Sequence, residues 1–111
     1  MKRALSLKSE ASFLYVRRHG TKFYGKFCTV TVMDAATTKV GVSVSKKIGN
    51  AVVRNKVKRR IKEIFVAILP RAVKNRHYLV SAKQGIEEAA FDALSKELEQ
   101  LLIKSRSISE C

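Results

Sequence analysis

Apolar residues recur at two different spacings along this chain, and the two spacings distinguish strands from helices. In the central parts of Tyr24 to Met33 and of Lys39 to Ser45, every second residue is apolar. An alternation of this kind predicts a β-strand that buries one face. Residues 34–38 are typical of a turn, so we expect the two strands to pair as a hairpin. The buried face of this hairpin is predicted to comprise Cys28, Val30, Val32, Val40, Val42 and Val44.

Two longer segments repeat their apolar residues every three or four positions, which predicts helices with one buried side. The first runs from Ala51 to about Leu69 and ends before Pro70, because proline has no backbone N–H with which to continue a helix. The second runs from Ile86 to Ile103. The residues that we expect to face the core are Val53, Val57, Ile61, Ile64 and Ile68 in the first helix and Phe91, Leu94, Leu98 and Leu101 in the second.

Two shorter elements complete the predicted order. Ser9 is a suitable cap for a short helix over residues 10–18, and Gly20 suits a left-handed residue just after its end. Residues 77–82 form a short apolar run that is consistent with a third strand. The predicted order is therefore α-β-β-α-β-α. We expect an α+β fold and one small sandwich-like domain over residues 1–111, since a chain of this length can bury a single core.

The charge of the chain indicates the kind of partner. It contains 23 Lys and Arg residues against 9 Asp and Glu, which gives a formal net charge of +14 and a pI near 10.3. Such a field favours binding to a polyanion, and nucleic acid is the better candidate because no predicted helix combines a basic face with an exposed aromatic one. Residues 87–111 carry 3 basic and 6 acidic groups, so we do not place them on the polyanion surface.

Composition also excludes several classes of protein. No apolar run is long enough to cross a bilayer, and the first residues lack the hydrophobic stretch of a signal peptide. Cys28 and Cys111 have no other Cys or His nearby at the spacing of metal ligands, so we expect neither a zinc site nor a disulfide framework. These features predict a cytoplasmic protein with no membrane partner.

Residues 46–62, KKIGNAVVRNKVKRRIK, carry the strongest functional signal because they contain eight basic groups and no acidic one. On a helix whose apolar residues face the core, these cations project from the opposite side and match the phosphates of a nucleic acid. A merely solvated helix face usually carries interspersed Glu, and here only Glu63 follows. Arg60 lies nearer the apolar edge, and we expect it to pair mainly with Glu63. The predicted RNA-binding residues are Lys46, Lys47, Arg54, Asn55, Lys56, Lys58, Arg59 and Lys62.

The second face of the predicted hairpin is small and hydroxylated, with Phe27 as its only aromatic residue. A solvent-facing sheet normally carries Lys and Glu, so this face predicts a shallow trough in which single-stranded bases stack. An ordinary solvated face is the alternative. We predict no catalytic residue, since neither His19 nor His77 has a carboxylate partner that the sequence places beside it.

Residues 40–63, VGVSVSKKIGNAVVRNKVKRRIKE, resemble the signature of the bacterial ribonuclease P protein family, in which a strand ending in SVSKK precedes a helix with an Arg-Asn-Arg-type motif. Residues 13–20, FLYVRRHG, resemble the first-helix segment of that family. Length and element order agree across nearly the whole chain. The resemblance implies that the basic helix joins the sheet through an unusual left-handed crossover.

The resemblance also implies a function for the chain, as the RNA-binding subunit of an endoribonuclease that removes the 5′ leader from precursor tRNA. In that family the RNA subunit carries the hydrolytic chemistry with magnesium, and the protein binds both this RNA and the precursor. The implied partners are therefore the catalytic RNA subunit and precursor tRNA, with no DNA and no membrane. The resemblance places the leader in a central cleft, whose matching positions here are Phe13, Phe27, Thr29, Ser43, Ser45 and Lys46.

Three positions depart from the pattern of the family. Lys56 replaces the second Arg of the motif and Lys62 takes the final basic position, so at both a forked donor becomes a point charge. Arg17 takes a cleft position where members can carry an aromatic residue, and we expect it to contact a phosphate there. A structural ribosomal or other generic RNA-binding protein is the alternative function. A helix-turn-helix DNA-binding protein is disfavoured because a strand follows the basic helix.

Overall fold

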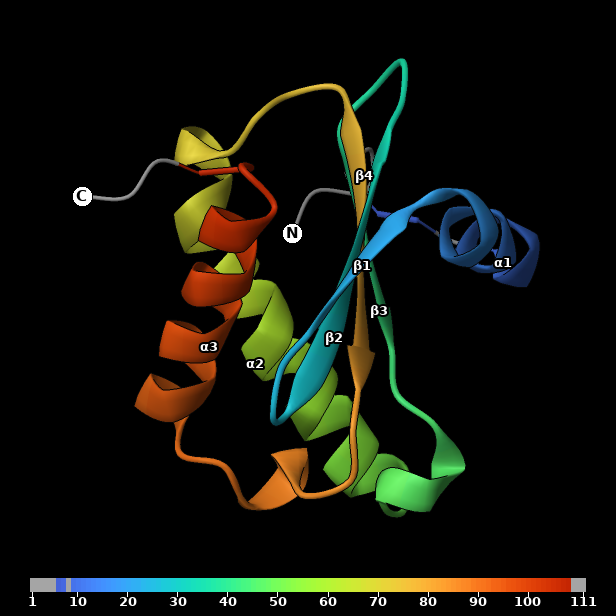
Figure 1. The fold of residues 1–111 in the computed structure, drawn as a ribbon. Helices are drawn as coiled ribbons and strands as arrows, with labels where there is room; N and C mark the ends of the chain where they lie inside the picture. The colour runs from blue at the N-terminus through green and yellow to red at the C-terminus, as the bar shows by residue number, and fades with distance from the viewer. Residues whose placement is uncertain (1–5, 8, 109–111) are drawn as a thin grey trace.

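The fold consists of a mixed four-stranded sheet between one helix on one face and two helices on the other (Figure 1). This computed structural model describes residues 6–7 and 9–108. Helix α1 covers one face of the sheet, and α2 and α3 cover the other (Figure 1). The elements are α1 (Glu10–His19), β1 (Thr21–Tyr24), β2 (Cys28–Asp34), β3 (Lys39–Ser43), η2 (Lys46–Ile48), α2 (Ala51–Ile68), η3 (Leu69–Arg71), β4 (Arg76–Ala82), η4 (Ile86–Glu88) and α3 (Phe91–Lys104).

The sheet has the order β1-β2-β4-β3, so the predicted hairpin between β2 and β3 is wrong. Strand β4 lies between them, antiparallel to β2 and parallel to β3. Its three central residues, Tyr78, Leu79 and Val80, are all fully buried. A strand that is buried on both faces belongs in the interior of a sheet, and the pairing of β4 with both neighbours satisfies this requirement.

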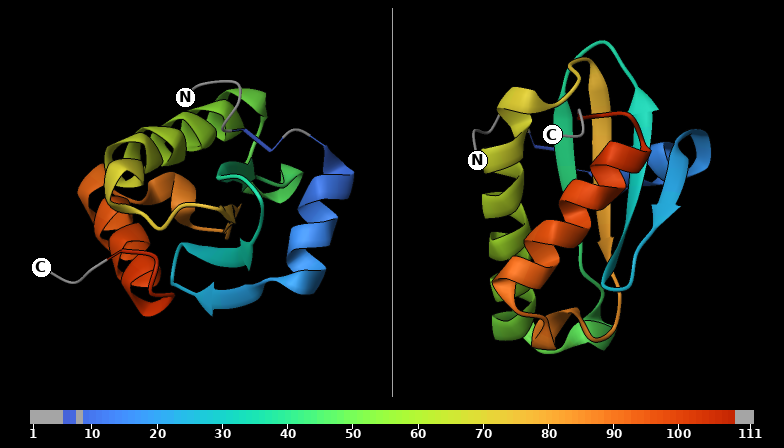
Figure 2. Two further views of the ribbon diagram at one scale, coloured as in Figure 1. Left: turned by 90° about the horizontal axis from the view of Figure 1, so that it is seen from above. Right: turned by 60° about the vertical axis from the view of Figure 1, so that its left-hand side comes forward.

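The connection from β3 through α2 to β4 is left-handed. In the right-hand view of Figure 2 the helices α2 and α3 lie in front of the sheet, and β3 and β4 both run downward with β4 to the right of β3. Almost all crossovers between parallel strands have the opposite hand. The structure therefore agrees with the crossover that the family resemblance implies.

The predicted α+β class and element order are confirmed, with one additional strand. The segment expected to form a single strand from Tyr24 is divided by a turn at residues 25–27, and the short β1 precedes it. Strand β1 pairs with β2 alone and is largely exposed, so its sequence lacks the alternation that marks a half-buried strand.

Two apolar clusters hold the layers together. The larger lies between the sheet and helices α2 and α3 and includes Val30, Ile61 and Leu98. The smaller joins Leu7, Val16 and Leu79 beneath α1. Because apolar residues on both faces of the sheet are buried, α1 is held on the sheet by the same hydrophobic burial that holds the longer helices.

Three local predictions need correction. Helix α3 begins at Phe91 rather than at Ile86, and Phe91 is 41% exposed instead of facing the core. Gly20 is extended, with φ −86°, rather than left-handed. Glycine is required at position 20 for a different reason: a Cβ atom there would lie only 2.6 Å from Thr31 Cγ2. None of the helices in the described part of the chain is both long and apolar enough to span a membrane.

Candidate nucleic-acid interface

Helix α2 is the rigid support of the predicted RNA-binding face. The side chain of Asn50 caps its first turn by accepting a hydrogen bond of 3.0 Å from the backbone N–H of Val53. Val57, Ile61 and Ile64 are buried against the sheet and α3. The burial of this stripe turns the cations of the helix toward solvent.

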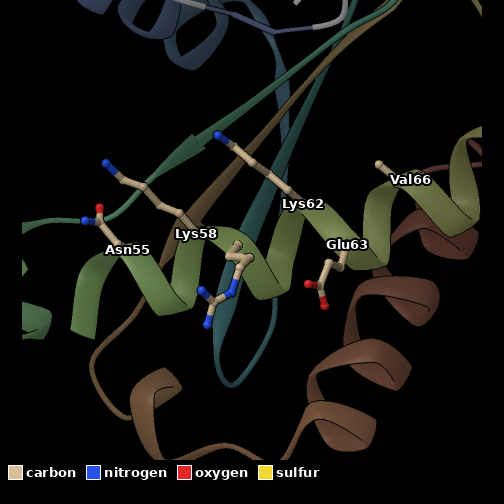
Figure 3. Close-up of a pocket in the computed structure, with 6 residues that line it drawn as sticks. Asn55, Lys58, Lys62, Glu63 and Val66 are labelled. Atoms are coloured by element: carbon tan, nitrogen blue, oxygen red, sulfur yellow. The ribbon is translucent and has the colours of Figure 1, made fainter. Parts of the chain in front are cut away.

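Four of the predicted residues of α2 line one pocket on the surface of the helix (Figure 3). Asn55, Lys58, Arg59 and Lys62 line a shallow pocket of about 580 Å³ together with Glu63 and Val66. Figure 3 shows Asn55, Lys58 and Lys62 pointing to the same side, with Glu63 turned away from them. No carboxylate lies within 4 Å of a cation of α2 in the described chain, so these charges are available to an external polyanion.

The other predicted contacts on this surface differ in exposure. Lys56 is exposed, whereas Arg54 is half-buried and its Nε has no hydrogen-bond partner among the described residues. Lys46 and Lys47 are exposed on η2, which the buried Ile48 anchors to the core just before α2 begins. The structure thus brings the eight predicted residues together on α2 and the turn that leads into it.

Arg60 does not pair with Glu63 as predicted. Its Nη1 donates a hydrogen bond of 3.3 Å to the carbonyl oxygen of Ala89, which precedes α3. The arginine therefore links α2 to the segment before α3. The position of Arg60 near the apolar edge of the helix was correctly predicted. Its hydrogen-bond partner, however, lies 29 residues away in sequence.

A second pocket, of about 520 Å³, lies between α1 and β3. Arg17 Nη2 donates a hydrogen bond of 2.8 Å to Ser43 Oγ, which joins its two walls. Lys58 of α2 also lines it, so this pocket and the pocket on α2 share a side chain. Gly41 permits the close approach of α1, because a Cβ atom there would lie 2.7 Å from Phe13 Cε1. The lining residues are Glu10, Phe13, Leu14, Arg17, Val42, Ser43, Val44 and Lys58.

Three predicted cleft residues meet in this pocket and four do not. Phe13, Arg17 and Ser43 line it. Phe27 lies in the β1–β2 turn and packs against the larger core cluster, and Thr29 lies on β2, with β4 between it and β3. Ser45 and Lys46 lie beyond the end of β3.

The shallow trough predicted on the second face of the hairpin does not describe the surface of the sheet. Thr31, which belongs to that face, is 1% exposed, and its Cγ2 lies beside Gly20 at the end of α1. Helix α1 covers this part of the sheet, and its Val16 is buried together with Leu79 of β4. A pocket at the β3 edge is accessible beside α1.

Glu10, Leu14, Val42 and Val44 also line the second pocket, although sequence reasoning missed them. A signal for the first two was present. Residues three and four apart share a helix face, so Glu10 and Leu14 follow from the position of Phe13 and Arg17 on α1. The two valines were assigned to the core by alternation, and both border the pocket at the rim of β3.

The titratable groups with shifted pKa values lie outside both pockets. Burial, and then the charge of Lys39, lower the pKa of His77 on β4. Burial raises the pKa of the Cys28 thiol, and the nearby Glu97 carboxylate raises it further. His19 is exposed and its ring lies 4.3 Å from that of Tyr15, centroid to centroid. The two pockets themselves are lined by Lys and Arg side chains, which suits them to binding a polyanion.

Comparison with known proteins identifies close relatives. The family model described as Ribonuclease P matches residues 1–106. The chain is 42% identical over 104 residues to the ribonuclease P protein component of Thermus aquaticus, covering 93% of this chain and 61% of the relative. It is 33% identical to the ribonuclease P protein component of Streptococcus pneumoniae (strain Hungary19A-6), covering 99% of this chain and 91% of the relative. The chain thus spans about three fifths of the length of the Thermus relative.

Solved structures agree with these sequence matches. The RNase P protein of Staphylococcus aureus, solved at 2.0 Å, superposes with a TM-score of 0.87 at 27% identity, covering 96% of this chain and 100% of that one. The RNase P protein of Thermotoga maritima has a TM-score of 0.81 at 24% identity, covering 89% of this chain and 96% of that one, and shows the same fold.

Proposed function

The chain belongs to the ribonuclease P protein family, and from this premise we propose that it is the RNA-binding subunit of ribonuclease P. In this role it assists a catalytic RNA in the endonucleolytic removal of the 5′ leader from precursor tRNA. The observation that carries the proposal is the row of cations on α2, beside a pocket that shares Lys58 with it. We assign the work to one RNA-binding domain over residues 1–111, acting in the cytoplasm.

We assign α2 and η2 to the RNA subunit. Phosphates along a folded RNA repel one another, and a row of fixed cations lowers this repulsion at little cost in ordering the protein. Arg59 supplies forked donors, whereas Lys56, Lys58 and Lys62 act as point charges. The side-chain amide of Asn55 supplies a neutral donor and acceptor for a 2′-hydroxyl.

We assign the pocket between α1 and β3 to the leader. Its wall offers the ring of Phe13 for stacking, and Arg17 of α1 and Lys58 of α2 supply positive charge. The hydrogen bond from Arg17 to Ser43 holds the guanidinium in place before a ligand arrives. A pocket of this kind favours the precursor over the mature product, because only the precursor has a leader.

We assign magnesium to the RNA. The described residues contain no group of three or more His, Cys, Asp or Glu side chains arranged to hold a metal ion. The donor set of this part of the protein is cationic and does not fit a divalent cation. The contribution of the chain is electrostatic: it orders the RNA whose phosphates hold the metal, and it binds the leader.

Binding of precursor and leaderless tRNA to the assembled holoenzyme tests this proposal. We expect tighter binding of the precursor. We expect Arg17→Ala to reduce the ratio of the two affinities roughly 10- to 150-fold, as for the loss of one charged hydrogen bond. Arg18→Ala is the matched control, because Arg18 is exposed on the same helix but does not line the pocket. Equal affinities of the wild-type holoenzyme for both RNAs would contradict the assignment.

A further inference from the structure

The turn between β1 and β2 combines exposed aromatic and basic side chains away from both pockets. Tyr24 is 67% exposed, and Lys83 Nζ lies 5.6 Å from the centroid of its ring. Lys26 Nζ lies 5.3 Å from the ring of Phe27. Rings interleaved with cations are typical of surfaces that bind single-stranded nucleic acid. We call residues 24–27 together with Lys83 the β1–β2 tip.

Helix α3 holds the backbone of the tip in place through the side chain of Glu97. The carboxylate of Glu97 accepts hydrogen bonds from the backbone N–H groups of Lys26, Phe27 and Cys28, the last two at 2.8 and 3.2 Å. Lys83 Nζ adds a hydrogen bond of 2.7 Å to the carbonyl oxygen of Gly25. The tip is therefore ordered without a ligand, which lowers the entropic cost of binding one.

The tip lies at the same end of the molecule as the start of the basic helix. In Figure 1 the β1–β2 turn, η2 and the first turn of α2 all lie toward the lower end of the sheet. Strand β1 forms one edge of the sheet and β3 the other, so the tip is separate from the pocket between α1 and β3. The exposed Lys26 of the tip and the exposed Lys46 and Lys47 of η2 are thus at one end.

We propose that the β1–β2 tip is a second RNA contact, in which an unpaired base stacks on Tyr24 and Lys26 neutralises a neighbouring phosphate. This inference rests on the proposed function in that it takes RNA as the partner. The charge of the tip supports RNA as the occupant, because the Glu97 carboxylate is directed to the backbone while Lys26 is exposed to solvent. An RNA segment that follows α2 toward η2 reaches this end of the sheet.

The chain contains no tryptophan, so a single tryptophan introduced at the position of Tyr24 reports on stacking directly. The Tyr24→Trp variant is titrated with a single-stranded oligoribonucleotide of mixed sequence, and binding is followed independently by the anisotropy of a label on the RNA. We expect saturable quenching of the tryptophan emission of this variant in parallel with binding. Phe91→Trp is the matched control, because Phe91 is 41% exposed in the acidic part of the chain, and the emission of that variant should stay constant.

Affinity provides a second measurement on the same RNA. Tyr24→Leu should weaken binding roughly 5- to 150-fold, as expected for the loss of one stacked base, whereas Tyr24→Phe should bind like the wild type. Lys26→Gln should reduce the slope of log affinity against log salt by about 0.7. Thermal unfolding of each variant shows that the fold is intact.

The outcomes separate this inference from the proposed function. Unquenched emission of the Tyr24→Trp variant, together with wild-type affinity of Tyr24→Leu, would overturn the tip as a contact while RNA binding itself persists. Failure of the wild-type chain to bind either the oligoribonucleotide or a ribonuclease P RNA would overturn both. Quenching in Tyr24→Trp, with a loss of affinity in Tyr24→Leu but not in Tyr24→Phe, supports the tip.

Discussion

At the scale of single residues, Glu97 is a structural anchor that the charge pattern did not reveal. Its carboxylate accepts three backbone N–H groups of the turn before and at the start of β2, 69 to 71 residues away in sequence. Charged hydrogen bonds of this kind are stronger than neutral ones. In the sequence Glu97 was one of several acidic residues near the C-terminus, and nothing local distinguished it.

Replacement of Glu97 should therefore destabilise the protein. We expect Glu97→Ala to lower the free energy of unfolding by about 1.5–3 kcal/mol, because the three N–H groups lose their acceptor. Glu99→Ala is the control on the same helix, since Glu99 forms an exposed ion pair of 3.5 Å with Arg71, and its loss should cost at most about 1 kcal/mol. Urea unfolding measures both, and equal effects would contradict this role of Glu97.

His77 should make stability depend on pH in mildly acidic solution. Its folded-state pKa is lowered by burial and by Lys39, so the unfolded chain binds its proton more readily. The stability contribution of neutral His77 is present above the unfolded-state pKa of about 6.5 and is lost as the pH falls below it. His77→Gln should reduce the pH dependence of unfolding between about pH 5 and 7. The exposed His19→Gln is the control, and identical profiles for His77→Gln and wild type would refute the prediction.

At the scale of elements, the helices were predicted far better than the strand pairing. The buried stripe of α2 follows from a spacing that lies within one segment, and its end follows from Pro70. The pairing of β2 with β4 joins segments that are distant in the chain, and a turn-like sequence after β2 favoured the wrong neighbour. Local periodicity identifies a strand, but the burial of β4 on both faces decides where it lies in the sheet.

The same difference, between patterns within one segment and the packing of distant segments, explains which parts of the candidate site could be predicted. The proposed RNA-binding residues of α2 could be placed on one surface from the sequence, because they share a helix with the apolar stripe that orients them. The second pocket depends on how α1 packs on β3, and only Phe13, Arg17 and Ser43 of the predicted cleft meet there. Phe27 and Thr29 were assigned to the same face by alternation, but the turn at residues 25–27 interrupts that pattern.

The cationic face of α2 should contribute to RNA affinity through counterion release. We expect Arg59→Ala to weaken binding of ribonuclease P RNA and to reduce the slope of log affinity against log salt by about 0.7–0.9. Lys104→Ala is the charge-matched control, because Lys104 is exposed at the end of α3 and outside both pockets. An unchanged salt slope in Arg59→Ala would remove this residue from the interface.

At the scale of the whole molecule, charge is divided between the two helices that cover one face of the sheet. Basic residues dominate α2 and η2, whereas the segment from residue 87 onward carries more acidic than basic groups. The left-handed crossover places α2 at the β3 edge of the sheet, where Lys58 joins the pocket beside α1 (Figure 2). The fold thus brings a cationic helix and the pocket between α1 and β3 into contact.

The assignment to ribonuclease P can be tested by cleavage of precursor tRNA by a bacterial ribonuclease P RNA at low magnesium, with and without this chain. We predict that the chain restores cleavage at the 5′ end of the mature tRNA. The gain should be larger for a precursor with a leader long enough to reach the pocket than for one with a minimal leader. A folded chain that gives no gain with a cognate RNA would contradict the assignment to ribonuclease P.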